Sequence, residues 1–375
     1  MNTQSIVNKF GTANLVKHIG NWYDCFIFSI SYEARSDVIW RQLLVDLKQS
    51  QKPVLSFYNE NHDYIEEFLS KAKNGLEGCA HTPIGLISNR PLASFDIIKN
   101  TINKILNKPS ALSKNDQAKP LKILLDITCF TRETLAMLFL ILKEYLPKGS
   151  VIRCLYVEAD YVEDAGEEYE HTEKNRSIDV DHEWLAKGID DVRFIVGYRG
   201  EVSLLAKKHL IILPGREETR TCNIIDRVMP DKITIGRTEN EEGRSGVEIF
   251  GKYARAREWI ISYCTHLLSE KNIDINSFVF SYKDPWLTMR NLIAKAQDGE
   301  NIMVSCMNTK IATIGVCMAA LLQKNIQLIY AAPLLYNRIN YPPAGKVIRM
   351  FDIPTSLEFS SVLVDKGGSG PDAIC

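Results

Sequence analysis

The stretch "LKILLDITCFTRETLAMLFLILKEYL" (residues 121–146) decides the fold class. An apolar run of strand length ends at Asp126, and a short polar turn leads into an apolar segment of helix length. A buried strand followed by a covering helix is typical of parallel α/β sheets. The same alternation recurs along the chain, so the sequence predicts an α/β protein with mainly parallel sheets.

A second stretch, "NIMVSCMNTKIATIGVCMAALLQK" (residues 301–324), follows the same plan. Each stretch places a threonine and a cation where its strand meets its helix, Thr131-Arg132 in the first and Thr309-Lys310 in the second. This agreement is a first sign that the chain contains two copies of one unit.

Two shorter motifs support the duplication. "SYEARS" (residues 31–36) and "REETRT" (residues 216–221) each place Glu-x-Arg and then a hydroxyl after the first predicted strand of a half. The order of the remaining elements also agrees. We infer an internal duplication that gives two tandem Rossmann-like domains related by a pseudo-two-fold axis.

The expected domain ranges follow from this repeat. "VRFIVGY" is interpreted as an added edge strand, with "KVIRMFDI" as its counterpart in the second half. The ranges are 1–160 for the first repeat, 161–204 for an acidic linker with an added strand, 205–365 for the second repeat, and 366–375 for a flexible tail.

Composition bounds the function. The chain has 375 residues, 45% of them hydrophobic, and a net charge of −1, so no global basic field indicates nucleic-acid binding. No signal-peptide pattern opens the sequence, and no apolar run reaches the roughly 18 residues of a membrane span. The nine cysteines are scattered without CxxC. These patterns predict a cytoplasmic protein without disulfides, metal or cofactor.

The marked motifs all lie at predicted strand ends. Open parallel sheets bind ligands beyond the carboxyl ends of their strands, and helix N-termini with added cations favour anions. We therefore expect a phosphate-binding crevice built without a glycine-rich loop. The predicted ligand-binding residues are Ser31, Glu33, Arg35, Asp126, Thr128, Thr131, Arg132, Glu218, Arg220, Ser305, Thr309 and Lys310.

Each of these features also has a purely structural interpretation. A threonine before a helix is most often an N-cap. Glu33 and Arg35 can simply pair with each other, and Asp126 can accept hydrogen bonds at a helix start. Duplication alone explains the repetition even where only one copy of the site still works.

Familiar catalytic motifs are missing. The sequence has no GxGxxG, no GxxxxGK[ST] and no GxSxG, and its seven histidines show no metal-ligand spacing. Arg176 and His182 have an R-x5-H spacing seen in nucleases, but "RSIDVDH" is expected to be extended, which disfavours that interpretation.

The segment "LLDITCFTRETLAMLF" resembles the ligand loop of CRISPR-associated Rossmann fold (CARF) domains, and "VSCMNTKIATIGVCMAAL" resembles it again. Two CARF-like units in one chain are similar to SAVED domains. The resemblance implies that Thr131-Arg132 and Thr309-Lys310 face one cyclic oligonucleotide. The family's Gly-Gly is replaced by Cys129-Phe130 and by Met307-Asn308, and Arg132 stands in place of lysine.

A different resemblance leads to an enzyme. "YDCFIFSISYEARS" is similar to the first box of Toll/interleukin-1 receptor (TIR) domains, whose members can cleave NAD. In that alternative, or in a cyclic-nucleotide-degrading one, Glu33 or Glu218 is the candidate catalytic acid. A third alternative is a structural subunit whose sites are relics.

The leading expectation is a ligand sensor. It binds a nucleotide or other phosphorylated small molecule between the two repeats and signals to a separately encoded effector protein in bacterial anti-phage defence.

Overall fold

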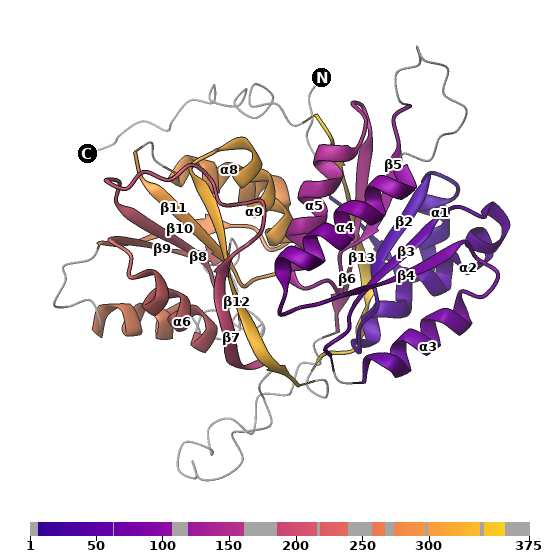
Figure 1. Cartoon of the computed structure of the whole chain (residues 1–375), viewed down its shortest axis with the longest axis horizontal. Coiled ribbons are helices and arrows are strands. Elements are labelled where there is room, and N and C mark those ends of the chain that lie inside the picture. The colour runs from indigo at the N-terminus through magenta and orange to yellow at the C-terminus, as the bar shows by residue number, and fades with distance from the viewer. Residues whose placement is uncertain are drawn as a thin grey trace, which may run out of the picture.

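The computed structural model describes residues 7–62, 64–106, 119–160, 186–215, 218–238, 257–266, 274–296, 299–337 and 341–356. The linker at 107–118, most of the acidic segment including Arg176 and His182, and the tail at 366–375 lie outside the described residues. Two sheets with helices on both faces make up the chain (Figure 1). The predicted fold class, α/β with two Rossmann-like halves, is confirmed.

The two sheets share one strand order. The first runs β1 (Asn8–Gly11), β13 (Ala344–Pro354), β6 (Val151–Ala159), β5 (Lys122–Asp126), β2 (Cys25–Ser29), β3 (Val54–Asn59), β4 (His81–Leu86). The second runs β7 (Ala186–Phe194), β12 (Ile326–Tyr336), β11 (Asn301–Cys306), β8 (Lys208–Leu213), β9 (Lys232–Thr238), β10 (Asp274–Phe280). Apart from β1, each strand has a counterpart. The order reverses between β2 and β5 and between β8 and β11, which are the places where doubly wound sheets bind ligands.

The halves exchange one strand each. β7 follows the first half in sequence but pairs antiparallel with β12 of the second sheet. β13 follows the second half but pairs antiparallel with β6 of the first sheet, and β1 then pairs with β13. The two added strands were anticipated from the sequence, but their exchange was not. The range 205–365 therefore includes a strand of the other half's sheet.

Helices cover both faces of both sheets. They are α1 (Leu15–Ile19), α2 (Val38–Ser50), α3 (Ile65–Gly75), α4 (Pro91–Leu106), α5 (Arg132–Tyr145), α6 (Glu218–Val228), α8 (Pro285–Lys295) and α9 (Lys310–Leu322), with helical residues 257–266 and the 3₁₀ turns η1 (Thr12–Asn14) and η2 (Ala34–Asp37). The apolar sides of α1, α2 and α3 pack on the outer face of the first sheet. α6 and residues 257–266 cover the outer face of the second.

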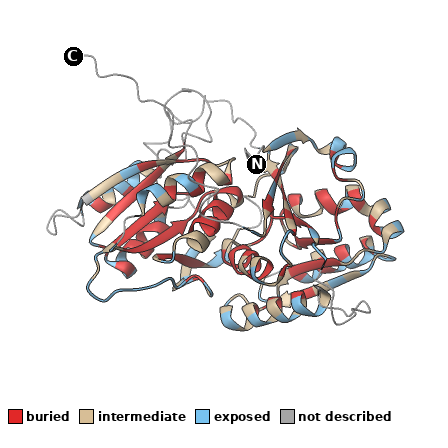
Figure 2. Ribbon diagram, turned by 90° about the horizontal axis from the view of Figure 1, so that it is seen from above, coloured by how far each residue is buried: buried red, intermediate tan, exposed pale blue. Residues whose placement is uncertain are grey.

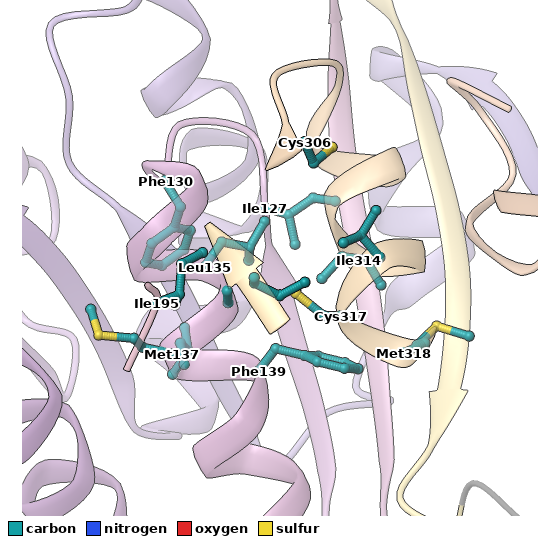
Figure 3. Close-up of a cluster of buried hydrophobic side chains, with 14 of the residues drawn as sticks. Ile127, Phe130, Leu135, Met137, Phe139, Ile195, Cys306, Ile314, Cys317 and Met318 are labelled. Atoms are coloured by element: carbon teal, nitrogen blue, oxygen red, sulfur yellow. The ribbon is translucent and has the colours of Figure 1, made fainter. Parts of the chain in front are cut away.

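The inner helices join the halves through a shared hydrophobic core. α5 and α9 are apolar nearly all round, as helices are when they are buried on every side. Leu135 and Phe139 of α5 lie beside Ile314 and Cys317 of α9 (Figure 3). Buried residues continue across this contact from one sheet to the other (Figure 2). Fully burying each such side chain contributes about 1.5–3 kcal/mol, so the halves stabilise each other.

Within the described residues, none of the helices combines the length and apolar character needed to span a bilayer.

Candidate functional site

A cavity of about 410 Å³ lies at the carboxyl ends of the central strands and takes its walls from both halves. Nine predicted site residues line it: Ser31, Glu33, Arg35, Thr128, Thr131, Arg132, Arg220, Thr309 and Lys310. Asp126, Glu218 and Ser305 are not among the described residues that line it. The two copies of the motif therefore meet at one place, although not with all of their residues.

The two threonines are N-caps. The hydroxyl of Thr131 accepts a hydrogen bond from the backbone N–H of Thr134 at 3.1 Å, and Thr309 accepts one from Ala312 at 3.2 Å. The Thr309 hydroxyl also donates to the carbonyl of Tyr282 at 2.7 Å. Both helices therefore begin at the cavity with their positive dipole ends toward it. The structural interpretation of the threonines is confirmed, while their role toward a ligand stays a prediction.

Glu33 and Arg35 pair with each other, and both side chains are buried. Arg35 also donates to the carbonyl of Val157 in β6 at 3.2 Å, with its guanidinium over the Tyr156 ring. The strand-end salt bridge expected from the sequence is therefore present. It fastens the loop after β2 to the neighbouring strand.

Arg220 repeats the anchoring in the second half. Its Nε donates to the carbonyl of Ala331 in β12 at 3.1 Å, and its guanidinium lies 5.4 Å from the Tyr330 ring centroid. Glu218, by contrast, begins α6 and is partly exposed. The arginines of the two Glu-x-Arg motifs thus make equivalent contacts with a neighbouring strand, whereas the two glutamates differ in burial and contacts.

Arg132 reaches across to the second half. Its Nε donates to the carbonyl of Asn308 at 2.9 Å, and its terminal nitrogen donates to the carbonyls of Met307 at 2.7 Å and Asn308 at 2.6 Å. These acceptors form the turn that leads to Thr309. Arg132 therefore holds the opposing loop, and because its partners are neutral carbonyls its positive charge remains uncompensated.

Lys310 occupies the position equivalent to Arg132 and has different surroundings. Burial, and then the nearby Arg132, lower the pKa of its amine to about 7, although Glu33 acts in the other direction. Among the described residues the amine has no hydrogen-bond or ion-pair partner. A partly buried lysine beside a guanidinium, at a cavity wall and without a partner among the described residues, leaves local positive charge that favours an anion.

Asp126 and Ser305 lie behind the cavity wall. The carboxylate of Asp126 accepts hydrogen bonds from the N–H of Thr128 at 3.0 Å and from its hydroxyl, and burial raises the Asp126 pKa to about 6. The Thr128 hydroxyl accepts a hydrogen bond from the N–H of Val157 at 3.0 Å. Ser305 is fully buried in β11. Asp126 therefore touches the cavity only through Thr128, which lines it, and Ser305 does not line it.

Sequence reasoning missed part of the lining. Glu158 and Arg349 form an ion pair between β6 and β13, and Lys9 of β1 lies opposite Arg349. These three residues reach the cavity only because the halves exchange strands, and the sequence does not reveal that exchange. Aromatic residues of the lining were also missed, among them Tyr32, His62, Tyr336 and Tyr341. Tyr32 lies inside the "SYEARS" motif and could have been included; the other three come from distant segments.

Basic side chains outnumber carboxylates around the cavity. The basic residues are Lys9, Arg35, Arg132, Arg220, Lys310 and Arg349, and the acidic residues are Glu33 and Glu158. In the described parts of the chain, no three His, Cys, Asp or Glu side chains gather as a metal site would require. The local chemistry therefore favours an anionic molecule.

Comparisons with known proteins give fold-level likeness only. No protein-family model matches the chain, and no curated protein matches it. Among solved structures, a type III CRISPR defence DNA nuclease activated by cyclic oligoadenylate is 8% identical, with a TM-score of 0.41 over 81% of this chain and 64% of the nuclease. This chain thus spans less than two thirds of that protein.

Two further structures show lower similarity. The cytoplasmic domain of a prokaryotic cation chloride cotransporter is 8% identical over 83% of this chain and 96% of its own, with a TM-score of 0.24. A putative universal stress protein from Pseudomonas aeruginosa UCBPP-PA14 is 11% identical over 83% and 94%, with a TM-score of 0.22. The Rossmann-like assignment of the two halves rests on their own strand order.

Proposed function

We propose that this protein is a sensor that binds a phosphorylated small molecule of the nucleotide type in the cavity between its halves. The observation that carries the proposal is Lys310, a partly buried lysine that lines the cavity and has no hydrogen-bond or ion-pair partner in the described structure. Arg132 adds an uncompensated positive charge beside it, and α5 and α9 both begin there. An anion with several oxygens would neutralise these charges and accept their hydrogen bonds.

The position of the cavity supports sensing. A ligand there touches loops of both halves, and Arg132 already ties those loops together. Binding would therefore change how the two halves are held against each other, and a change of this kind can be transmitted to a separate effector protein. The resemblance of both threonine–cation segments to CARF and SAVED domains adds the expectation of a cyclic oligonucleotide and of a role in anti-phage defence.

The enzyme alternative assigns acid catalysis to Glu33 or Glu218. Glu33 is paired with Arg35, and Glu218 does not reach the cavity in the described structure. These placements favour binding over catalysis.

Calorimetry with mononucleotides and a panel of cyclic oligonucleotides tests the proposal. We expect at least one compound to bind, and Lys310→Met to weaken it about 10- to 100-fold, since hydrogen bonds to charged groups contribute about 1.5–3 kcal/mol. The matched control is Lys324→Met, which removes an exposed lysine. If the wild-type protein binds nothing, the function is wrong; if Lys310→Met binds as well as wild type, the site is wrong. Chromatography of the incubated ligands separates a sensor, which leaves them intact, from an enzyme.

A further inference from the structure

Four aromatic rings gather at one part of the cavity wall. Tyr32 follows β2, His62 follows β3, Tyr336 ends β12, and Tyr341 precedes β13. The ring centroids of Tyr32 and Tyr341 are 5.1 Å apart, and those of His62 and Tyr336 are 5.0 Å apart. Segments from both halves therefore build one aromatic cluster, which we define as these four residues.

The rings of this aromatic cluster meet at steep angles. Tyr32 and Tyr341 are inclined by 75°, and His62 and Tyr336 by 55°. The rings are therefore not stacked face to face on one another, and an inclined ring covers at most one face of its partner. All four side chains are only partly buried and line the cavity. A cluster that served only as core packing would be fully enclosed.

A second, smaller cavity of about 210 Å³ adjoins the aromatic cluster. His62 and Tyr336 line both cavities, and so does Asn59 at the end of β3. The side-chain amide of Asn59 makes no hydrogen bond with any residue in the described ranges. An amide presents a donor and an acceptor side by side, the pattern that matches the edge of a nucleobase.

We propose that the aromatic cluster stacks the nucleobase of the bound molecule and that Asn59 reads the edge of that base. This inference rests on the proposed function, because it places the phosphate of the same molecule at Lys310. Tyr32 is adjacent in sequence to Glu33, and the charge of Glu33 raises the pKa of Lys310. The aromatic cluster and Lys310 therefore lie along one wall of the cavity. The site then requires a nucleotide and discriminates against sugar phosphates that have no base.

Titration of the full chain with ribose 5-phosphate and with the four nucleoside 5′-monophosphates tests this inference. We expect at least one nucleotide to bind about 5- to 150-fold more tightly than ribose 5-phosphate, the range measured for stacking of one base on an aromatic side chain. Tyr336→Leu should reduce this difference, measured as the ratio of nucleotide to ribose 5-phosphate affinity within the same variant. Tyr336→Phe keeps the ring and should keep the difference.

Asn59→Ala provides an independent readout, because it leaves every ring in place. It should reduce the preference among the four bases while each still binds better than ribose 5-phosphate. Equal affinity of the wild type for ribose 5-phosphate and all four nucleotides overturns the base site alone. Absence of binding by every phosphate compound overturns the proposed function as well. Circular dichroism of each variant identifies loss of folding.

Discussion

The turns before α5 and α9 descend from the same sequence pattern but use their cations differently. Arg132 donates to two carbonyls of the opposing turn, whereas Lys310 keeps a buried amine without a partner in the described structure. A planar guanidinium with five donors suits a brace between two loops, and a compact amine with a shifted pKa suits contact with a bound anion. The two equivalent positions thus hold cations with different contacts, one that joins the two turns and one that has no partner among the described residues.

The glutamates of the two halves give the largest expected contrast. Glu33→Ala should lower the free energy of unfolding by about 3–5 kcal/mol, because it leaves the buried Arg35 without its carboxylate. Glu218→Ala should lower it by less than about 1 kcal/mol, the worth of a partly exposed carboxylate at a helix start. Urea denaturation measures both variants. Equal effects would mean that the Glu33–Arg35 pair is not the anchor of its loop.

Variants of Arg132 and Lys310 should differ in their free energy of unfolding in the same urea denaturation assay. Arg132→Ala should destabilise the protein by about 2–4 kcal/mol, because the carbonyls of Met307 and Asn308 lose their donors. Lys310→Met should cost nothing or raise stability, since it removes the desolvation of a buried amine. Arg132→Lys serves as a control, because it keeps the positive charge and removes the planar set of guanidinium donors. If Lys310→Met were the more damaging change, the assignment of roles would be reversed.

The pH dependence of anion binding isolates Lys310. With a pKa of about 7 its amine is neutral above that value, so the amine must take up a proton when an anion binds there. Sulfate affinity should therefore be highest below pH 7 and fall above it, by up to about tenfold per pH unit. Sulfate keeps a constant charge in this range.

The groups that face Lys310 are Arg132, Glu33, Arg35 and Cys129. Burial raises the pKa of the Cys129 thiol, so that thiol stays neutral near pH 7. Asp126, whose pKa burial raises to about 6, titrates below this range, so a fall in affinity above pH 7 belongs to Lys310. Lys310→Arg, which remains protonated, should give a flat profile between pH 7 and 9. A flat profile for the wild type would remove Lys310 from the anion site.

The same titration affects folding. Between about pH 7 and the usual lysine value, the unfolded chain holds a proton on Lys310 that the folded protein lacks. This group therefore makes the free energy of unfolding rise with pH across that window.

The N-caps give the smallest contrast. Thr131→Ala should cost about 1 kcal/mol of folding free energy through the lost cap. Thr309→Ala should cost up to about 1 kcal/mol more, because its hydroxyl donates to the Tyr282 carbonyl outside its own helix, whereas the Thr131 hydroxyl donates to Thr134 one turn along the same helix. Thermal unfolding of both variants, with Thr→Ser as the matched control at each position, checks this difference. Identical shifts would show that the Tyr282 hydrogen bond adds nothing.

Local patterns in the sequence determined much of this molecule. The alternation of apolar strands and helices predicted the α/β class, and the paired Thr-cation and Glu-x-Arg motifs predicted two related halves meeting at strand ends. Such features depend on contacts between residues close in the chain. Burial periodicity and helix capping act over a few residues, so the sequence displays them directly.

Only the tertiary structure decided which strands each half would share. The exchange of β7 and β13 depends on which sheet edge each strand meets after a long connection, and neither strand's pattern names its partner. The exchange places Lys9 and Arg349 at the cavity. Chain crossing likewise brings Tyr336 and Tyr341 to Tyr32 and His62. The difference between Arg132 and Lys310 has the same origin, because burial and the position of the opposing loop determine which cation is paired and which has no partner among the described residues.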